Sequence, residues 1–141
     1  MPNASELAQD RLAYFPHDSN ASNDIKCQRL IRRLGWSGYG RWWRVCELLA
    51  SNKGHVIPFS TEEDKLILGD VLQFGDGSNF CELLCIEEVT ALLSIGLLQT
   101  DENGCLENPR MHENALSFGK KRAAGRKGGR PRKNPQPNQN A

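Results

Sequence analysis

The pattern of apolar and polar residues is clearest over residues 24–51, where it predicts two consecutive helices. Apolar residues at helical spacing share one face of the first helix, which we expect to end at Gly35: Cys27, Leu30, Ile31 and Leu34. Three residues before it are candidate N-caps, namely Ser22, Asn23 and Asp24. After a short turn, a second helix is predicted from about Tyr39 to Ser51, and its wide apolar face indicates a core helix.

Beyond residue 53 the pattern predicts a strand and further helices. The β-branched pair and the proline of residues 54–59 favour a brief extended segment. Ser60 or Thr61, with an acidic residue three positions later, looks like a capping box that begins a helix through about Phe74. A helical pattern then covers residues 80–95 and ends before a glycine.

The last predicted element is a β-hairpin over residues 97–108. Its turn contains Asn103-Gly104, a pair that supplies the positive φ angles of a tight turn. Helices, a short strand, helices again and a hairpin follow one another in the order of a winged helix. The expected fold class is therefore mainly α with a small β-hairpin, in a winged-helix-like domain.

The two ends of the chain lack the pattern of a packed domain. Residues 120–141 contain no large apolar residue and cannot bury a core. We therefore divide the chain into a loose arm (1–11), a winged-helix-like domain (12–117) and a disordered basic tail (118–141). A single domain of this size needs neither metal nor disulfides to fold.

The net charge of +1 hides a strongly uneven distribution. Residues 1–23 carry −2, and residues 24–53, with seven basic and two acidic residues, carry +5. Residues 54–113 have two basic and twelve acidic residues, giving −10, whereas residues 114–141 have eight basic residues and no acid. Such an asymmetry points to a polyanion or to an acidic partner surface.

The basic tail is the strongest functional signal, because cations without acids contact phosphates and release counterions. Residues 129–133, Gly-Arg-Pro-Arg-Lys, also resemble an AT-hook, which lies in a narrow minor groove, although one of the usual arginines is missing. The alternative is a solvated linker. The candidate DNA-binding residues of the tail are Lys120, Lys121, Arg122, Arg126, Lys127, Arg130, Arg132 and Lys133.

A second candidate surface is the cationic side of the two helices within residues 24–51. It is a duplex-binding patch, a surface for self-association with the acidic half of another copy, or a plain solvated face. The helix expected over 86–95 carries Glu87 and Glu88 and no cation, so we do not expect it to read the major groove. The residues of the cationic surface are Lys26, Arg29, Arg32, Arg33, Arg41 and Arg44.

Other side chains suggest chemistry but are better explained by structure. Cys81, Cys85, Cys105 and His112 lack the paired spacing of a zinc site, so buried reduced thiols and no metal are expected. His17 and Asp18 have no nucleophile nearby in sequence, and we expect Asp18, Asn20 and Asn23 to satisfy backbone amides. Of the aromatic residues that could stack on unpaired bases, Trp42 and Trp43 are expected in the core, and Trp36 is the one expected at the surface.

The sequence shows no phosphate-binding glycine loop, nucleophile motif or dinucleotide fingerprint. We therefore expect no enzyme, no cofactor and no small-molecule substrate. No apolar run approaches the length of a membrane span, and the first residues do not have the composition of a signal peptide. A cytoplasmic protein that does not associate with membranes is predicted.

Several blocks of the sequence resemble a known family, the Lin-type N-terminal domain of phage and prophage replication proteins. They are Tyr14 to Asp24, Gly35 to Gly40, Trp43, Glu47-Leu48-Leu49, Gly96-Leu97-Leu98 with the hairpin, Asn108 to Met111, and the basic segment from Ala124 to Arg130. The resemblance spans about Leu12 to Asn114. It implies a winged helix related to the N-terminal domain of DnaD-like primosome proteins, used in replication initiation on mobile elements.

The sequence thus predicts a non-enzymatic DNA-associated protein of a phage or mobile element, of the replisome-organiser type, whose basic tail contacts DNA phosphates. The alternative is a protein-protein interaction or oligomerisation module of a primosome that does not itself bind DNA. Its partner would be a replisome protein or another copy of the chain.

Overall fold

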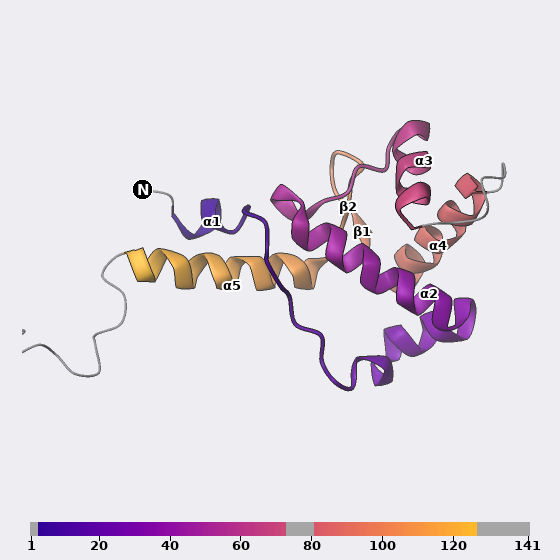
Figure 1. Ribbon diagram of the computed structural model, residues 1–141, viewed down its shortest axis with the longest axis horizontal. Coiled ribbons are helices and arrows are strands. Elements are labelled where there is room, and N and C mark those ends of the chain that lie inside the picture. Colours follow the sequence, from indigo (N-terminus) through magenta and orange to yellow (C-terminus); the bar gives the residue numbers. More distant parts are fainter. Residues whose placement is uncertain (1–2, 73–80, 127–141) are drawn as a thin grey trace, which may run out of the picture.

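The structure, a computed structural model, describes residues 3–72 and 81–126. It is mainly helical, and its elements are α1 (Ala4–Leu7), the 3-10 turn η1 (Ala21–Asn23), α2 (Ile25–Ser51), the 3-10 turn η2 (Lys53–His55), α3 (Glu62–Val71), α4 (Cys81–Ile95), β1 (Gln99–Thr100), β2 (Leu106–Glu107) and α5 (Pro109–Arg126). Figure 1 shows α2, α3, α4 and the hairpin gathered at one end of the molecule. Helix α5 extends away from them, with α1 alongside it.

Helix α2 consists of two helices joined at Gly35. This residue has φ 70° and ψ −171°, backbone angles that strain any residue with a side chain. The predicted end of the first helix is therefore confirmed. The short turn predicted between Gly35 and a second helix from about Tyr39 is wrong, because the second helix begins directly at Trp36.

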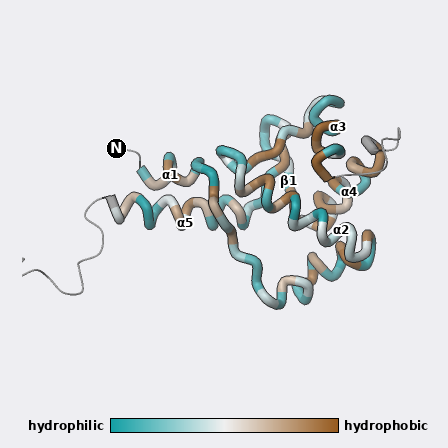
Figure 2. Tube along the Cα trace, in the orientation of Figure 1, coloured by the Kyte–Doolittle hydropathy of each residue, from teal (hydrophilic) through white to brown (hydrophobic). Residues whose placement is uncertain are grey.

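The hydrophobic core lies between α2, α3, α4 and the hairpin. In Figure 2 strongly apolar segments gather in α3 and α4, whereas the segment between α1 and α2 is largely hydrophilic. The apolar face predicted within residues 39–51 is the centre of this core. Buried members of the core include Leu30, Trp42, Val45, Leu49, Leu68, Cys85, Val89, Leu92 and Leu106.

Helix α3 begins with the predicted capping box. The Thr61 hydroxyl accepts a hydrogen bond from the Asp64 backbone N–H at 3.0 Å, and the Asp64 carboxylate accepts one from the Thr61 N–H at 3.2 Å. The latter hydrogen bond holds the pKa of Asp64 below its ordinary value. Helix α3 ends at Val71, and the predicted end near Phe74 lies outside the described residues.

The sheet is small. β1 and β2 pair antiparallel, with Gln99 opposite Glu107 and Thr100 opposite Leu106. Leu106 also forms a bridge with Ile57, and Val56 is extended, so the extended segment predicted over 54–59 is confirmed in part, whereas residues 54 and 55 belong to η2. The chain before α3 is thereby attached to the second strand of the hairpin.

The hairpin turn is built differently from the prediction. Gly104 has a positive φ of 80°, but Asn103 does not. Instead, the Asp101 carboxylate accepts hydrogen bonds from the backbone N–H groups of Asn103 at 2.8 Å and Cys105 at 2.9 Å. The turn is therefore stabilised by the Asp101 side chain rather than by a second positive φ angle at Asn103.

Both ends of the described chain are packed, unlike the loose arm and the tail that the sequence predicted. Helix α1 packs along α5 and buries Leu7. Helix α5 continues to Arg126, so residues 118–126 of the predicted tail are helical. A side chain on Gly119 would overlap the carbonyl oxygen of Ala4, so this close crossing of α1 and α5 requires glycine. Disorder of residues 127–141 stays a prediction, because they lie outside the described residues.

A hydrogen bond from His55 connects the N-terminal arm, residues 3–12, to the rest of the domain. The buried Nε2 of His55 lies 2.9 Å from the Asp10 carbonyl oxygen, which can only accept, so Nε2 carries the proton. Burial lowers the pKa of His55. The Gly54 N–H donates to the Gln9 carbonyl oxygen at 2.8 Å. Residues 3–12 are therefore part of the domain rather than a loose arm.

Candidate nucleic-acid interface

The first half of α2 presents three arginines, which we call the arginine triad: Arg29, Arg32 and Arg33. The helix is started by Asp24, whose carboxylate accepts hydrogen bonds from the N–H groups of Lys26 and Cys27 at 3.0 and 3.4 Å. Cys27 and Leu30 are buried on the inner side, which leaves the triad exposed on the outer side. Within residues 3–72 and 81–126, no member of the triad forms an ion pair. Three such guanidinium groups suit an anionic partner.

Lys26 has a different position, although the sequence placed it with the triad. Its Nζ donates a hydrogen bond to the backbone oxygen of Gly96 at 3.2 Å. Gly96 follows the last residue of α4, where free carbonyl groups attract cations. Lys26 therefore connects the start of α2 to the end of α4.

Arg41, in the second half of α2, faces α4. Its Nη1 lies 3.8 Å from Oε1 of Glu88, whose side chain is only 2% exposed. Burial raises the pKa of Glu88 to about 7, while the charge of Arg41 opposes that rise. Arg41 thus partly compensates the charge of a buried acid, and Glu88 faces Arg41 in the interior rather than solvent. Glu87, its neighbour, is exposed.

Arg44 is the other cation of the second half. Its Nη1 contacts Oε1 of Glu47 at 3.1 Å, a pair one helical turn apart on an exposed face. The predicted patch of arginines is therefore two groups. Those before Gly35 lack ion-pair partners in the described part of the chain, whereas Arg41 and Arg44 have them.

The tail cations begin on a helix rather than in a flexible segment. Lys120, Lys121 and Arg122 lie exposed on α5. Arg122 pairs with Asp10 of the arm at 3.1 Å, and Nζ of Lys121 lies 5.7 Å from the Phe118 ring centroid. The other predicted residues are Arg126, whose side chain is not described, and Lys127, Arg130, Arg132 and Lys133, which lie outside the described residues.

The structure does not bring the two groups of cations together. In Figure 1 the end of α5 and the first half of α2 lie at opposite ends of the molecule. A single compact basic patch is therefore excluded for the described residues, and any polyanion would meet the two groups separately.

The aromatic residues follow the prediction. Trp42 is buried, and the Trp43 ring stacks on His17, with centroids 3.5 Å apart and planes 9° apart. His17 therefore has a structural role, as expected. The expectation that Asp18, Asn20 and Asn23 satisfy backbone amides with their side chains is wrong. Within the described residues none of the three forms such a bond, and the cap of α2 comes from Asp24. Trp36 is 67% exposed and is the one tryptophan available for stacking on a ligand.

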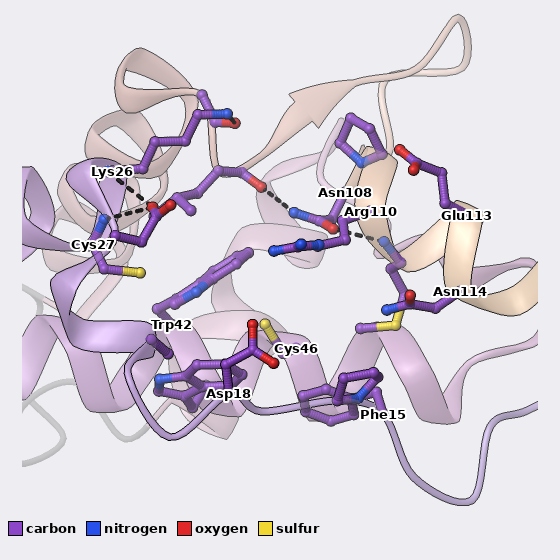
Figure 3. A pocket seen from close by; sticks show the side chains of 18 of the residues that line it. Phe15, Asp18, Lys26, Cys27, Trp42, Cys46, Asn108, Arg110, Glu113 and Asn114 are labelled. Carbon is purple, nitrogen blue, oxygen red and sulfur yellow. Dashed lines mark hydrogen bonds between the residues drawn. The ribbon is translucent and has the colours of Figure 1, made fainter.

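Sequence reasoning missed a groove of about 630 Å³ between residues 15–24, α2 and the start of α5. In Figure 3, Arg110 of α5 extends into this groove toward Trp42. Its lining carries both signs of charge, Asp18 and Glu113 besides Arg110, which does not favour a polyanion. The sequence does carry a signal for the start of α5, which forms one side of the groove. Asn108 is a favourable N-cap residue, and its side chain accepts a hydrogen bond from the Met111 N–H at 2.8 Å.

Comparison with known families gives one match. A family model described as Lin1244/Lin1753-like, N-terminal, matches residues 14–106. The chain belongs to this family. The match confirms the Lin-type resemblance. It covers residues 15–24, which line one side of the groove, together with α2, α3, α4 and the hairpin. Helices α1 and α5 lie outside the matched residues. No curated protein and no solved structure matches the chain.

The Lin1244/Lin1753-like domain contains buried thiols. Cys27, Cys46 and Cys85 are buried and unbridged, and Cys105 is partly buried. Burial raises the pKa of Cys27 and of Cys46, which keeps both thiols protonated. Nowhere in residues 3–72 or 81–126 do three or more metal-binding side chains gather. Across the same residues, each helix is too short or too polar to cross a bilayer.

Proposed function

We propose that the chain is a non-enzymatic DNA-associated protein of a phage or other mobile element, acting in replication initiation in the cytoplasm. The arginine triad is the observation that carries the DNA contact. Its three exposed guanidinium groups have no ion-pair partner among the described residues. DNA phosphates that contact these guanidinium groups would release their bound counterions. Binding should therefore weaken steeply with salt and depend little on base sequence.

We further propose that the domain is a winged helix. The order α2, Ile57, α3, α4 and hairpin supports this assignment, as does the bridge between Ile57 and Leu106 in the second hairpin strand. A winged helix commonly places the helix before the hairpin in the major groove. Here that helix is α4, which exposes Glu87 and contains no lysine or arginine. We therefore assign the DNA contact to the backbone phosphates and to α2.

The basic end of the chain would add a second contact. Lys120 and Lys121 are exposed on α5, and four more cations follow Arg126 in the sequence. The AT-hook-like residues 129–133 would favour an A·T-rich minor groove. Because α5 and the triad lie at opposite ends of the molecule, the two contacts should contribute separately to affinity.

A salt titration of DNA binding by fluorescence anisotropy tests the proposal. We would compare the full chain with R29Q/R32Q/R33Q, with K127Q/R130Q/R132Q/K133Q, and with R11Q/K53Q/K65Q as a control that removes equal charge elsewhere. Each lost phosphate contact should lower the slope of log affinity against log salt by about 1, so the triad variant should lose about 3. The control should change little.

An unchanged slope in the triad variant would contradict the assignment to α2. If the full chain bound no DNA even at low salt, the second candidate function would be favoured, a protein-interaction or oligomerisation module of a primosome. The observation behind that candidate is the set of exposed apolar residues on α3 and α4: Leu66, Ile67, Leu83 and Leu84.

A further inference from the structure

Two of the surfaces that expose large apolar side chains in the described residues are opposite in charge. On α3, Glu63, Leu66 and Ile67 follow the spacing i, i+3 and i+4, and Ile67 is 56% exposed. On α4, Leu83 is 61% exposed, with Leu84 and Glu87 beside it. Helices α3 and α4 together contain seven acidic residues and one lysine. We call this the acidic face: Glu63, Leu66, Ile67, Leu83, Leu84 and Glu87.

The second surface surrounds the arginine triad. Ile25, 57% exposed, shares one side of α2 with Arg29 and Arg32 at the spacing i, i+4 and i+7. Trp36, 67% exposed, follows directly after the break at Gly35. The first half of α2 has four cations and no acid. We call this the basic face: Ile25, Arg29, Arg32, Arg33 and Trp36.

The two faces lie at opposite ends of α4. The hydrogen bond from Lys26 fixes the start of α2 at Gly96, after the last turn of α4, whereas Leu83 lies in its first turn. At a rise of about 1.5 Å per residue, this separation is about 20 Å. Screening at physiological salt acts over about 8 Å. The faces of one chain therefore cannot neutralise each other, and Figure 1 shows α3 and the first half of α2 on opposite sides of the fold.

We propose that the acidic face of one copy docks on the basic face of the next, so that the chain associates with itself head to tail. Each face offers apolar side chains within charges that complement the other, and tryptophan and arginine are the residues that most often dominate interface affinity. DNA phosphates would account for the arginines but not for the exposed leucines. Contacts of this heterologous kind extend into rings or filaments. The inference does not require that the chain bind DNA.

Charge reversal of each face separately gives the sharpest test. In R29E/R32E the acidic face is intact, and in E63K/E87K the basic face is intact. Masses would be measured by sedimentation without DNA, over a range of protein concentrations at low salt. We expect the wild-type mass to rise with concentration and to fall with added salt. Each variant alone should be monomeric. Their equimolar mixture should associate again, because the intact acidic face of R29E/R32E complements the intact basic face of E63K/E87K, and the two reversed faces complement each other.

Variants R11E and E102K reverse exposed charges on neither face and should associate like the wild type. L66S/I67S tests the apolar contribution without a charge change and should weaken association about tenfold or more. Thermal unfolding confirms that each variant is folded. A wild-type chain that is monomeric at every concentration would overturn the proposal. So would a dimer that persists in both reversed variants, or a mixture of the two that stays monomeric.

The same variants separate this inference from the proposed function. E63K/E87K should be monomeric yet retain DNA binding, because its arginine triad is unchanged. DNA binding by a wild-type chain that never associates would leave the proposed function standing and overturn only the head-to-tail contact. Association without DNA binding would support the head-to-tail contact and overturn only the proposed function.

Discussion

The two halves of α2 use the same residue type for different purposes. Before Gly35, the triad arginines face solvent without an ion-pair partner in the described part of the chain. After Gly35, Arg41 faces the buried Glu88 and Arg44 pairs with Glu47. A count of cations along the sequence treats these arginines as equal. The break at Gly35 therefore also separates exposed arginines that form no ion pair among the described residues from arginines that pair with acidic residues of the fold.

The largest expected effect concerns the buried acid behind Arg41. The pKa of Glu88 is about 7 in the folded protein, above the value of about 4.3 for an unfolded glutamate. Between these values the folded state keeps a proton that the unfolded state has released, so the free energy of unfolding falls as pH rises through this window. Glu88→Gln should remove the penalty and stabilise the protein at pH 8 by up to roughly 3 kcal/mol.

Thermal unfolding at about pH 4 and pH 8 checks this expectation. The wild type and Glu88→Gln should be closer in stability at the lower pH than at the higher one. Glu87→Gln, on the exposed neighbour, serves as the control and should follow the wild type. Equal pH dependence in the wild type and Glu88→Gln would mean that the pKa of Glu88 is the same in the folded and unfolded states.

A smaller effect is expected at the break itself. Gly35→Ala places a side chain at φ 70° and should cost about 1–3 kcal/mol of unfolding free energy. Gly40→Ala is the matched control, because that glycine lies within helix with no atom near its added Cβ, and the change should stabilise by up to about 1 kcal/mol. Urea denaturation measures both. Two variants with the same stability would show that Gly35 does not fix the break.

The smallest effect separates the arginines of the two halves. Arg41→Gln should destabilise the protein by about 1 kcal/mol at pH 8 and less at pH 5, where Glu88 is protonated and needs no partner. Arg29→Gln should change stability by less than about 0.5 kcal/mol. A double-mutant cycle of Arg41→Gln with Glu88→Gln measures the coupling. If it is zero, the 3.8 Å pair contributes nothing to stability.

Features set by a few neighbouring residues were predictable from the sequence. The break at Gly35, the N-cap at Asp24 and the capping box of Thr61 and Asp64 all follow from local hydrogen bonding and backbone preference. The burial of Trp42 followed from helical periodicity, and Trp36 was expected at the surface because it lies outside that apolar face.

Features that depend on distant contacts were not predictable in the same way. Nothing near Arg41 in sequence indicates Glu88, and nothing near Gly119 indicates the Ala4 backbone that crosses it. Helix α5 did leave a signal in Met111, Ala115 and Phe118, which are spaced by four and three residues. The basic composition that follows outweighed this signal in the prediction of a tail.

The crossing of α1 over α5 constrains the order in which the protein can be completed. Ala4 and Gly119, which lie in contact, are 115 residues apart in the chain, so Gly119 is synthesised long after Ala4. A ribosome therefore releases the rest of the domain before the N-terminal helix has a surface to dock on. Residues 9–12 can bond to residues 50–55 early, whereas α1 lacks its packing surface until α5 has left the ribosome, so α1 docks late in folding during synthesis.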